Sequence, residues 1–183
     1  MSEGPAIGLL ELTSIARGIV AADAMAKRAS VQVVQSRTVC PGKFYTLVAG
    51  DEESVRLALE TGVHYAGDYL VDRLVIPRVH EQVLPAVLAV QPLPGLLSVG
   101  IIETFSLAGT ILAADAACKT APVTLIEVRL GMGLGGKAYV TMTGDQHDVE
   151  ASLAAGVAAI DPALRLRSEI IPAPHPSLGP TLL

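Results

Sequence analysis

Residues 19–27 read IVAADAMAK, and residues 111–119 read ILAADAACK, 92 positions further along the chain. These stretches lie at the centre of a longer repeat: between Ile7–Arg37 and Val99–Arg129, 13 of 31 positions are identical. The identities include Gly, Glu, Asp, Lys and Arg, which an alanine-rich composition does not place in one register by chance. The chain is therefore a tandem duplication, and we expect whatever one half does to be done by a pair.

The repeat continues beyond this segment with a slip of two positions. Gly42–Gly62 aligns with Gly136–Gly156, with 8 of 21 positions identical. A third match follows, since residues 76–80 read IPRVH and residues 171–175 read IPAPH. We therefore expect two domains, at residues 5–90 and 96–180. A unit of roughly 90 residues buries only a modest core by itself.

Both halves predict the element order βαββαβ, an α+β fold of the ferredoxin-like kind. In the first half Ser14 and Asp51 are expected to cap the two helices. The first helix is expected to carry Ile15, Ile19, Ala22 and Met25/Ala26 on one face. The expected elements are strand 7–12, helix 14–29, hairpin 31–39 and 44–49, helix 51–62, strand 70–76 and a helix at 81–90 interrupted at Pro85; then strand 99–103, helix 106–119, hairpin 123–130 and 137–143, helix 145–159 and strand 164–171.

Composition narrows the function classes. The net charge of −5 and the lack of a basic stripe disfavour nucleic acid as a partner. With 51% hydrophobic and 17% charged residues, part of the apolar surface is expected between subunits. The acidic N-terminus and two widely spaced cysteines predict a cytoplasmic protein. Val83–Ile102 is apolar, but its prolines and glycines favour a helix, a linker and a strand over a membrane span.

Few residues suggest chemistry. Gly131, Gly133 and Gly136 form a GxGxxG pattern, but a strand follows where a dinucleotide site needs a helix, so a flexible hairpin loop is the better interpretation. Asp23 and Asp115 recur in register without a neighbouring nucleophile or base, which argues against an enzyme. Lys27 and Lys119, four residues on, can pair with them or project outward.

The two cysteines differ in their expected setting. Cys118 lies in a predicted helix and is expected to behave as a small hydrophobic residue. Cys40 occupies the hairpin tip Thr38-Val39-Cys40-Pro41-Gly42-Lys43, where Pro41 stiffens the chain and Gly42 lets it turn. The residues alone leave open whether this thiol is a ligand or incidental.

Several of these motifs resemble the bacterial microcompartment shell domain. They are GLLELTS at 8–14, AADAMAK at 21–27, Gly42-Lys43, Gly50-Asp51 and the Ile-Pro-x-x-His endings. Two copies in one chain resemble the tandem-domain, trimer-forming shell proteins, and the resemblance covers residues 5–180. Residues 38–44 (TVCPGKF) and 133–137 (GLGGK) resemble the two loops of the propanediol-utilisation type, in which a cysteine from each of three chains holds an iron–sulfur cluster.

The resemblance implies a homotrimer with pseudo-sixfold symmetry that tiles with other shell proteins into a polyhedral microcompartment shell. It implies one [4Fe–4S] cluster per trimer, ligated by Cys40 from each of three chains, for electron transfer across the shell to a redox enzyme inside. The implied pore loops contain Thr38, Val39, Pro41, Gly42, Gly131, Gly133, Gly135 and Gly136. The implied tile-edge residues are Lys27, Lys119, Arg78, His80 and His175.

The chain departs from the shell-domain pattern at two edge positions. Val79 stands where Pro is usual, and Ala173 stands where Arg is usual. Edge packing is therefore expected to differ on alternate sides of the tile. Two alternatives stay open at this point: a metabolite pore without a cluster, and a trimeric regulator that binds a small ligand between subunits.

Overall fold

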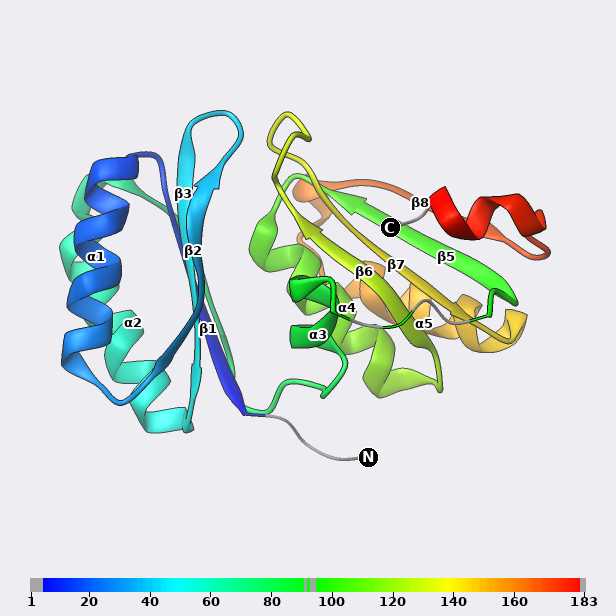
Figure 1. Cartoon of the computed structure of the whole chain (residues 1–183), viewed down its shortest axis with the longest axis horizontal. Helices are drawn as coiled ribbons and strands as arrows, with labels where there is room; N and C mark the ends of the chain where they lie inside the picture. Colours follow the sequence, from blue (N-terminus) through cyan, green and yellow to red (C-terminus); the bar gives the residue numbers. More distant parts are fainter. Residues whose placement is uncertain (1–4, 91, 93–94, 182–183) are drawn as a thin grey trace. The chain divides into compact units, whose positions relative to one another are not determined.

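The structure is a computed structural model that describes residues 5–90, 92 and 95–181. It contains two compact units, which divide between Val79 and His80. Each unit is an antiparallel four-stranded sheet with helices on one face (Figure 1). The α+β fold with two copies of one module is confirmed.

The first unit follows the predicted order closely. Its sheet has the order β2-β3-β1-β4, so that the first strand lies between the third and the fourth, as in ferredoxin-like folds. The elements are β1 (Ala6–Leu12), α1 (Ile15–Arg28), β2 (Gln32–Val39), β3 (Lys43–Gly50), α2 (Glu52–Ala66), the 3-10 turn η1 (Gly67–Tyr69) and β4 (Leu70–Ile76).

The second unit repeats this topology with the order β6-β7-β5-β8. It begins with an additional short helix and ends in a 3-10 turn. The elements are α3 (Val83–Leu88), β5 (Ser98–Thr104), α4 (Leu107–Thr120), β6 (Thr124–Leu130), β7 (Ala138–Gly144), α5 (Gln146–Ala158), η2 (Pro162–Leu164), β8 (Arg165–Ile171) and η3 (Pro176–Thr181).

The two sheets match in register as well as in order. In β2 the register against β3 shifts between Val33 and Gln35, and in β6 the register against β7 shifts between Leu125 and Glu127. The positions are 92 apart in both cases, so a residue in one sheet has a defined counterpart in the other.

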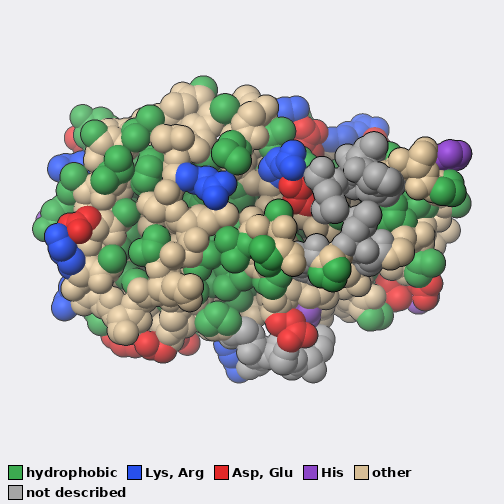
Figure 2. Space-filling model, viewed as in Figure 1, with side chains coloured by type: hydrophobic (Ala, Val, Ile, Leu, Met, Phe, Trp, Pro, Cys, Tyr) green, Lys and Arg blue, Asp and Glu red, His purple; other side chains and the backbone are tan. Residues whose placement is uncertain are grey.

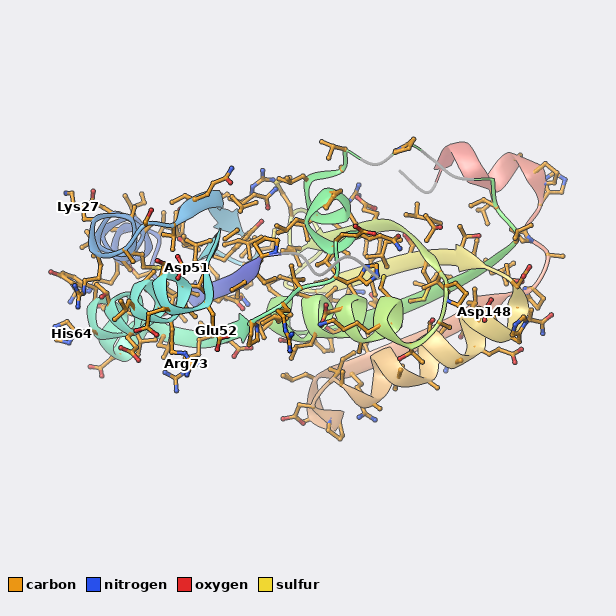
Figure 3. The ribbon with its side chains drawn as sticks, turned by 90° about the horizontal axis from the view of Figure 1, so that it is seen from below. Lys27, Asp51, Glu52, His64, Arg73 and Asp148 are labelled. Carbon is orange, nitrogen blue, oxygen red and sulfur yellow. The ribbon has the colours of Figure 1, made fainter. Side chains whose placement is uncertain are left out.

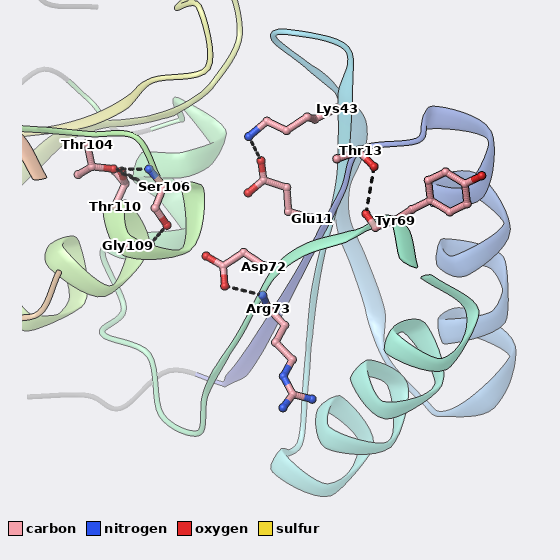
Figure 4. A network of polar contacts seen from close by, with 10 residues as sticks. All are labelled: Glu11, Thr13, Lys43, Tyr69, Asp72, Arg73, Thr104, Ser106, Gly109 and Thr110. Atoms are coloured by element: carbon pink, nitrogen blue, oxygen red, sulfur yellow. Dashed lines mark hydrogen bonds and ion pairs between the residues drawn. The ribbon is translucent and has the colours of Figure 1, made fainter. Parts of the chain in front are cut away.

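The helix starts follow from their capping residues. Ser14 accepts a hydrogen bond from the Arg17 backbone N–H (3.3 Å), and Asp51 accepts one from the Ser54 N–H (2.9 Å). In the second unit Ser106 caps α4 through the Gly109 N–H (2.8 Å), as Figure 4 shows. These side chains satisfy backbone donors that have no partner within the helix.

Three details differ from the sequence predictions. The buried side of α1 carries Gly18, Ala21 and Met25, whereas Ile15 and Ile19 are 38% and 56% exposed. Of the predicted apolar face of α1, only Met25 is fully buried. The close approach of the helix to Phe44 explains this, because a side chain at Gly18 would overlap the Phe44 ring.

The other two differences concern helix ends. Helix α2 continues past Gly62 to Ala66 and ends at Gly67, whose φ is +54°. Gly62 is instead buried against Met25. Helix α3 is shorter than predicted, and Pro85 lies within its first turn, where proline is tolerated because no helical N–H bond is lost.

Candidate functional site: two hairpin tips and an exposed edge

The hairpin between β2 and β3 carries the candidate ligand Cys40 at its tip. Cys40 is free and half-buried, while Thr38, Pro41 and Gly42 are exposed. The Cys40–Pro41 peptide is cis, and Gly42 has φ +91°, a conformation that favours glycine. The Gly42 N–H donates to the Val39 carbonyl (3.0 Å) and closes the turn. The predicted tip is thus a tight turn that presents a thiol.

The corresponding hairpin between β6 and β7 ends in a longer loop without bulky groups at most positions. Four glycines there have positive φ: +68° at Gly131, +75° at Gly133, +61° at Gly135 and +89° at Gly136. Gly133 and Gly135 are exposed, and a Cβ at either position would meet no atom within 4 Å. This confirms a glycine loop rather than the start of a dinucleotide-binding helix.

An ion pair lies at the base of each hairpin. In the first unit Lys43 pairs with Glu11, whose side chain is 2% exposed (Figure 4). In the second unit Lys137 pairs with Glu103 at 2.6 Å, with side chains 41% and 31% exposed. Burial raises the pKa of Glu11 above its ordinary value, and the neighbouring Lys43 opposes that rise. We did not predict these pairs, although both Glu and Lys recur in the repeat.

A second polar contact lies on the strands of each hairpin. Tyr139 donates to Glu127 (2.7 Å), which also pairs with Arg129 (2.7 Å). In the first unit Tyr45 donates to Gln35, the counterpart of Glu127. Burial raises the pKa of both tyrosines to about 12, so their hydroxyls remain protonated donors at neutral pH.

The two cysteines have different chemistry. Cys118 is buried in α4, and burial together with nearby Asp115 raises its pKa to about 12. Its burial within the helix separates this thiol from the surface. Cys40 is half-buried at a tight turn, beside the exposed Pro41 and Gly42. Within the described part of the chain, no three His, Cys, Asp or Glu side chains are grouped so that they could hold a metal ion.

The predicted edge lysines lie on the same helix position of each unit. Lys27 pairs with Asp23 at 2.6 Å and Lys119 with Asp115 at 2.7 Å, four residues apart as predicted. The side chain of Lys27 is 75% exposed and that of Lys119 is 42% exposed. Figure 3 shows Lys27 at the end of its helix, pointing away from the first unit.

The other three predicted edge residues differ in their exposure to solvent. Arg78 and His175 are exposed, and His175 contacts the Ser177 hydroxyl (2.7 Å). His80 is only 8% exposed, and its backbone N–H donates to Asp115 Oδ1 (2.7 Å). A role of all five residues at a tile edge stays a prediction.

Comparison with known proteins matches this architecture. The BMC domain matches residues 6–79 and 98–174. The bacterial microcompartment shell protein PduT of Citrobacter freundii is 46% identical over 174 residues, 94% of this chain and 95% of that protein. The major carboxysome shell protein CsoS1A of Halothiobacillus neapolitanus is 37% identical over 83 residues, 44% of this chain and 85% of that protein.

A solved structure agrees in fold. A crystal structure of a microcompartment protein from Desulfitobacterium hafniense DCB superposes with a TM-score of 0.90 at 48% identity, over 94% of this chain and 97% of that one. In the part of this chain that the structure describes, no helix is both long and apolar enough to cross a membrane. Taken with the duplicated module, these matches show that the chain belongs to the BMC-domain family, as a structural, non-enzymatic microcompartment shell protein of the PduT type with two tandem domains.

Proposed function

We propose that three copies of this chain form a pseudo-hexagonal shell tile whose central pore holds one [4Fe–4S] cluster. Two domains per chain and closed cyclic symmetry give six modules from three chains. Three features support a ring: the duplication, the family, and the exposed apolar side chains of α1, among them Ile15, Ile19 and Val20. Figure 2 shows hydrophobic side chains at the surface of the first unit, with few charged groups between them.

The observation that carries the cluster proposal is the placement of Cys40. It is a free thiol at a tight hairpin tip, and Gly42 beside it has no atom within 4 Å of a Cβ position. Thiolate is the donor that iron–sulfur clusters use. Since the described residues of one chain offer no grouped metal ligands, a cluster needs donors from more than one copy. Cys40 at a threefold axis would supply three thiolates.

Three Cys40 thiolates would ligate three of the four irons of a [4Fe–4S] cluster. Iron–sulfur cubes usually have four cysteine ligands, so three Cys40 thiolates leave the fourth iron to a non-protein ligand. Incomplete ligation predicts sensitivity to oxygen. Cys118 is unsuited to complete the set because it is buried in α4, away from the hairpin tip.

The bound cluster would supply one-electron transfer through the shell wall, to a redox enzyme inside. The chain's own residues hold the site. Glu11 and Lys43 anchor the base of the cysteine hairpin, and the nearly bare Gly131–Gly136 loop of the second repeat would leave room between cysteine tips. Electrons could then cross without opening the shell to metabolites.

Anaerobic purification with iron and sulfide assays tests this proposal. The wild type should contain four irons and four sulfides per trimer, with broad absorbance near roughly 400 nm. Cys40→Ser should lose iron, sulfide and colour yet stay trimeric, because the tip is not part of the core. Cys118→Ser is the matched control and should retain the cluster. Absence of iron from reconstituted wild type, or bleaching by Cys118→Ser instead, would contradict the proposal and leave a metabolite pore.

A further inference from the structure

The loop between β6 and β7 carries one large exposed side chain. Met132 is 57% exposed, and no other hydrophobic side chain of residues 131–137 is exposed to that degree. The glycines on either side have positive φ, +68° at Gly131 and +75° at Gly133. These conformations favour glycine and let the chain turn with the methionine side chain at the surface. Figure 1 shows the loop extending past the ends of its two strands.

Met132 occupies the position that Cys40 has in the first module. The repeat offset of 92 holds to Arg37 and Arg129, and continued to the start of the turn it pairs Cys40 with Met132. Both hairpins therefore begin their turn with a sulfur-containing side chain. The two-residue slip of the repeat comes after this point, so the second turn is longer by two residues.

This equivalence brings the two kinds of side chain together in the proposed ring. Equivalent positions in a ring of six similar modules lie at similar distances from the axis, so three Cys40 and three Met132 side chains would alternate around it. The cysteine turn offers little cover there, since Gly42 has no side chain and a Cβ in its place would meet no atom within 4 Å. The longer turn and three rotatable bonds give Met132 the greater reach.

The proposed cluster has one iron that needs cover. Three thiolates leave that iron with a non-protein ligand, so it is the point where oxygen can attack. Apolar groups around a metal centre control the access of solvent to it and its reduction potential. A flexible, apolar thioether side chain can fill an irregular space of this kind.

We propose that the Met132 side chains of three copies lie over this iron and limit the access of water and oxygen to it. The inference rests on the proposed function, because it needs both the ring and the cluster. Met132 acts by exclusion and not as a ligand, so the iron keeps its non-protein ligand and the side chain gains or loses no electron.

The cover also has an electrostatic consequence. Reduction adds negative charge to the cluster, and water stabilises added charge better than an apolar side chain does. Removal of the cover should therefore raise the reduction potential as well as speed the attack of oxygen.

Air exposure of anaerobically reconstituted protein tests the cover. In Met132→Ala the visible absorbance of the cluster should decay several-fold faster than in wild type, and the midpoint potential should rise. Met132→Leu has similar volume and no sulfur, so it should behave as wild type in both measurements. Leu134→Ala is the matched control on the same loop and should change neither, because Leu134 is half-buried.

Iron content and light scattering, measured before air is admitted, separate this inference from the proposed function. A wild-type protein that is monomeric or holds no iron would overturn both. If wild type holds its cluster, an unchanged decay rate or potential in Met132→Ala would overturn the cover alone. Decay of Met132→Leu or Leu134→Ala at the rate of Met132→Ala would overturn it too, as would failure of Met132→Ala to take up iron without oxygen present.

Discussion

The helix pairs Asp23–Lys27 and Asp115–Lys119 have the same residues at the same spacing in two modules of one chain, yet they differ in environment. Asp115 is 10% exposed because it also binds the His80 backbone, whereas Asp23 is 60% exposed. The two copies have thus kept the same helix pair but differ in the contacts that bury its aspartate. Of the two carboxylates, only that of Asp23 is largely open to solvent.

The largest expected effect concerns the outer edge. The double variant Lys27→Glu/Lys119→Glu should retain the trimer and form no sheets, because charge reversal is repeated along every edge of a lattice. Each exposed contact contributes only about 0–1 kcal/mol by itself. Electron microscopy of overexpressed protein measures the sheets.

The single variants sharpen the comparison. Lys119→Glu should also lower the free energy of unfolding, because it places a second carboxylate beside the partly buried Asp115. Lys27→Glu should lower it less, because residues 23 and 27 are both exposed to solvent. Unchanged sheets in the double variant would remove both lysines from the edge.

The two modules also differ in the residues that pack their cores. Gly18 and Phe44 of the first unit correspond to Thr110 and Ala138 of the second. The larger residue of the pair is therefore on the strand in the first unit and on the helix in the second. A Cβ at Gly18 would lie 2.4 Å from Phe44 Cδ1. Gly18→Thr alone should therefore destabilise by about 1–3 kcal/mol, and Phe44→Ala by about 3–5 kcal/mol.

Together the two changes copy the second unit's arrangement. The double variant should be more stable than the sum of the single losses predicts, with a coupling of about 1–3 kcal/mol between neighbouring positions. Urea unfolding at one fixed protomer concentration provides all four values. If the losses of unfolding free energy in the two single variants simply add in the double variant, residues 18 and 44 do not share one packing space.

The hairpin bases should differ in a similar way, with a loss below that of Phe44→Ala. Lys43→Met leaves the buried Glu11 carboxylate without its cation and should cost on the order of 3 kcal/mol at pH 7. Lys137→Met removes the partner of a more exposed Glu103 and should cost at most about 1 kcal/mol.

The pH dependence of Lys43→Met has a definite sign. Burial raises the pKa of Glu11 above 4.5, and losing Lys43 removes an opposing influence. The folded variant therefore takes up a proton at a higher pH than the unfolded chain, and its deficit relative to wild type should shrink as pH falls from 7 towards 4.5. A deficit that is constant over this range would mean that Glu11 is not the group left unpaired.

The sequence predicted the strands, the helices and two of the caps because those depend on local residues such as Ser14 and Asp51. It did not predict the buried side of α1, since Ile15 and Ile19 have the right spacing and only the tight approach to Phe44 turns Gly18 inward. The Glu11–Lys43 pair depends on strand register, and the burial of His80 depends on Asp115, which is distant in sequence. Local patterns carry no information about such contacts.

Native mass spectrometry of anaerobically purified protein tests the central claim most directly, because it weighs chains and cofactor together. The account predicts one species that contains three chains of 18.9 kDa plus the mass of four irons and four sulfides. The same measurement on Cys40→Ser should give three chains alone. A wild-type monomer, or a trimer whose mass shows no iron and sulfide after reconstitution, would contradict the account.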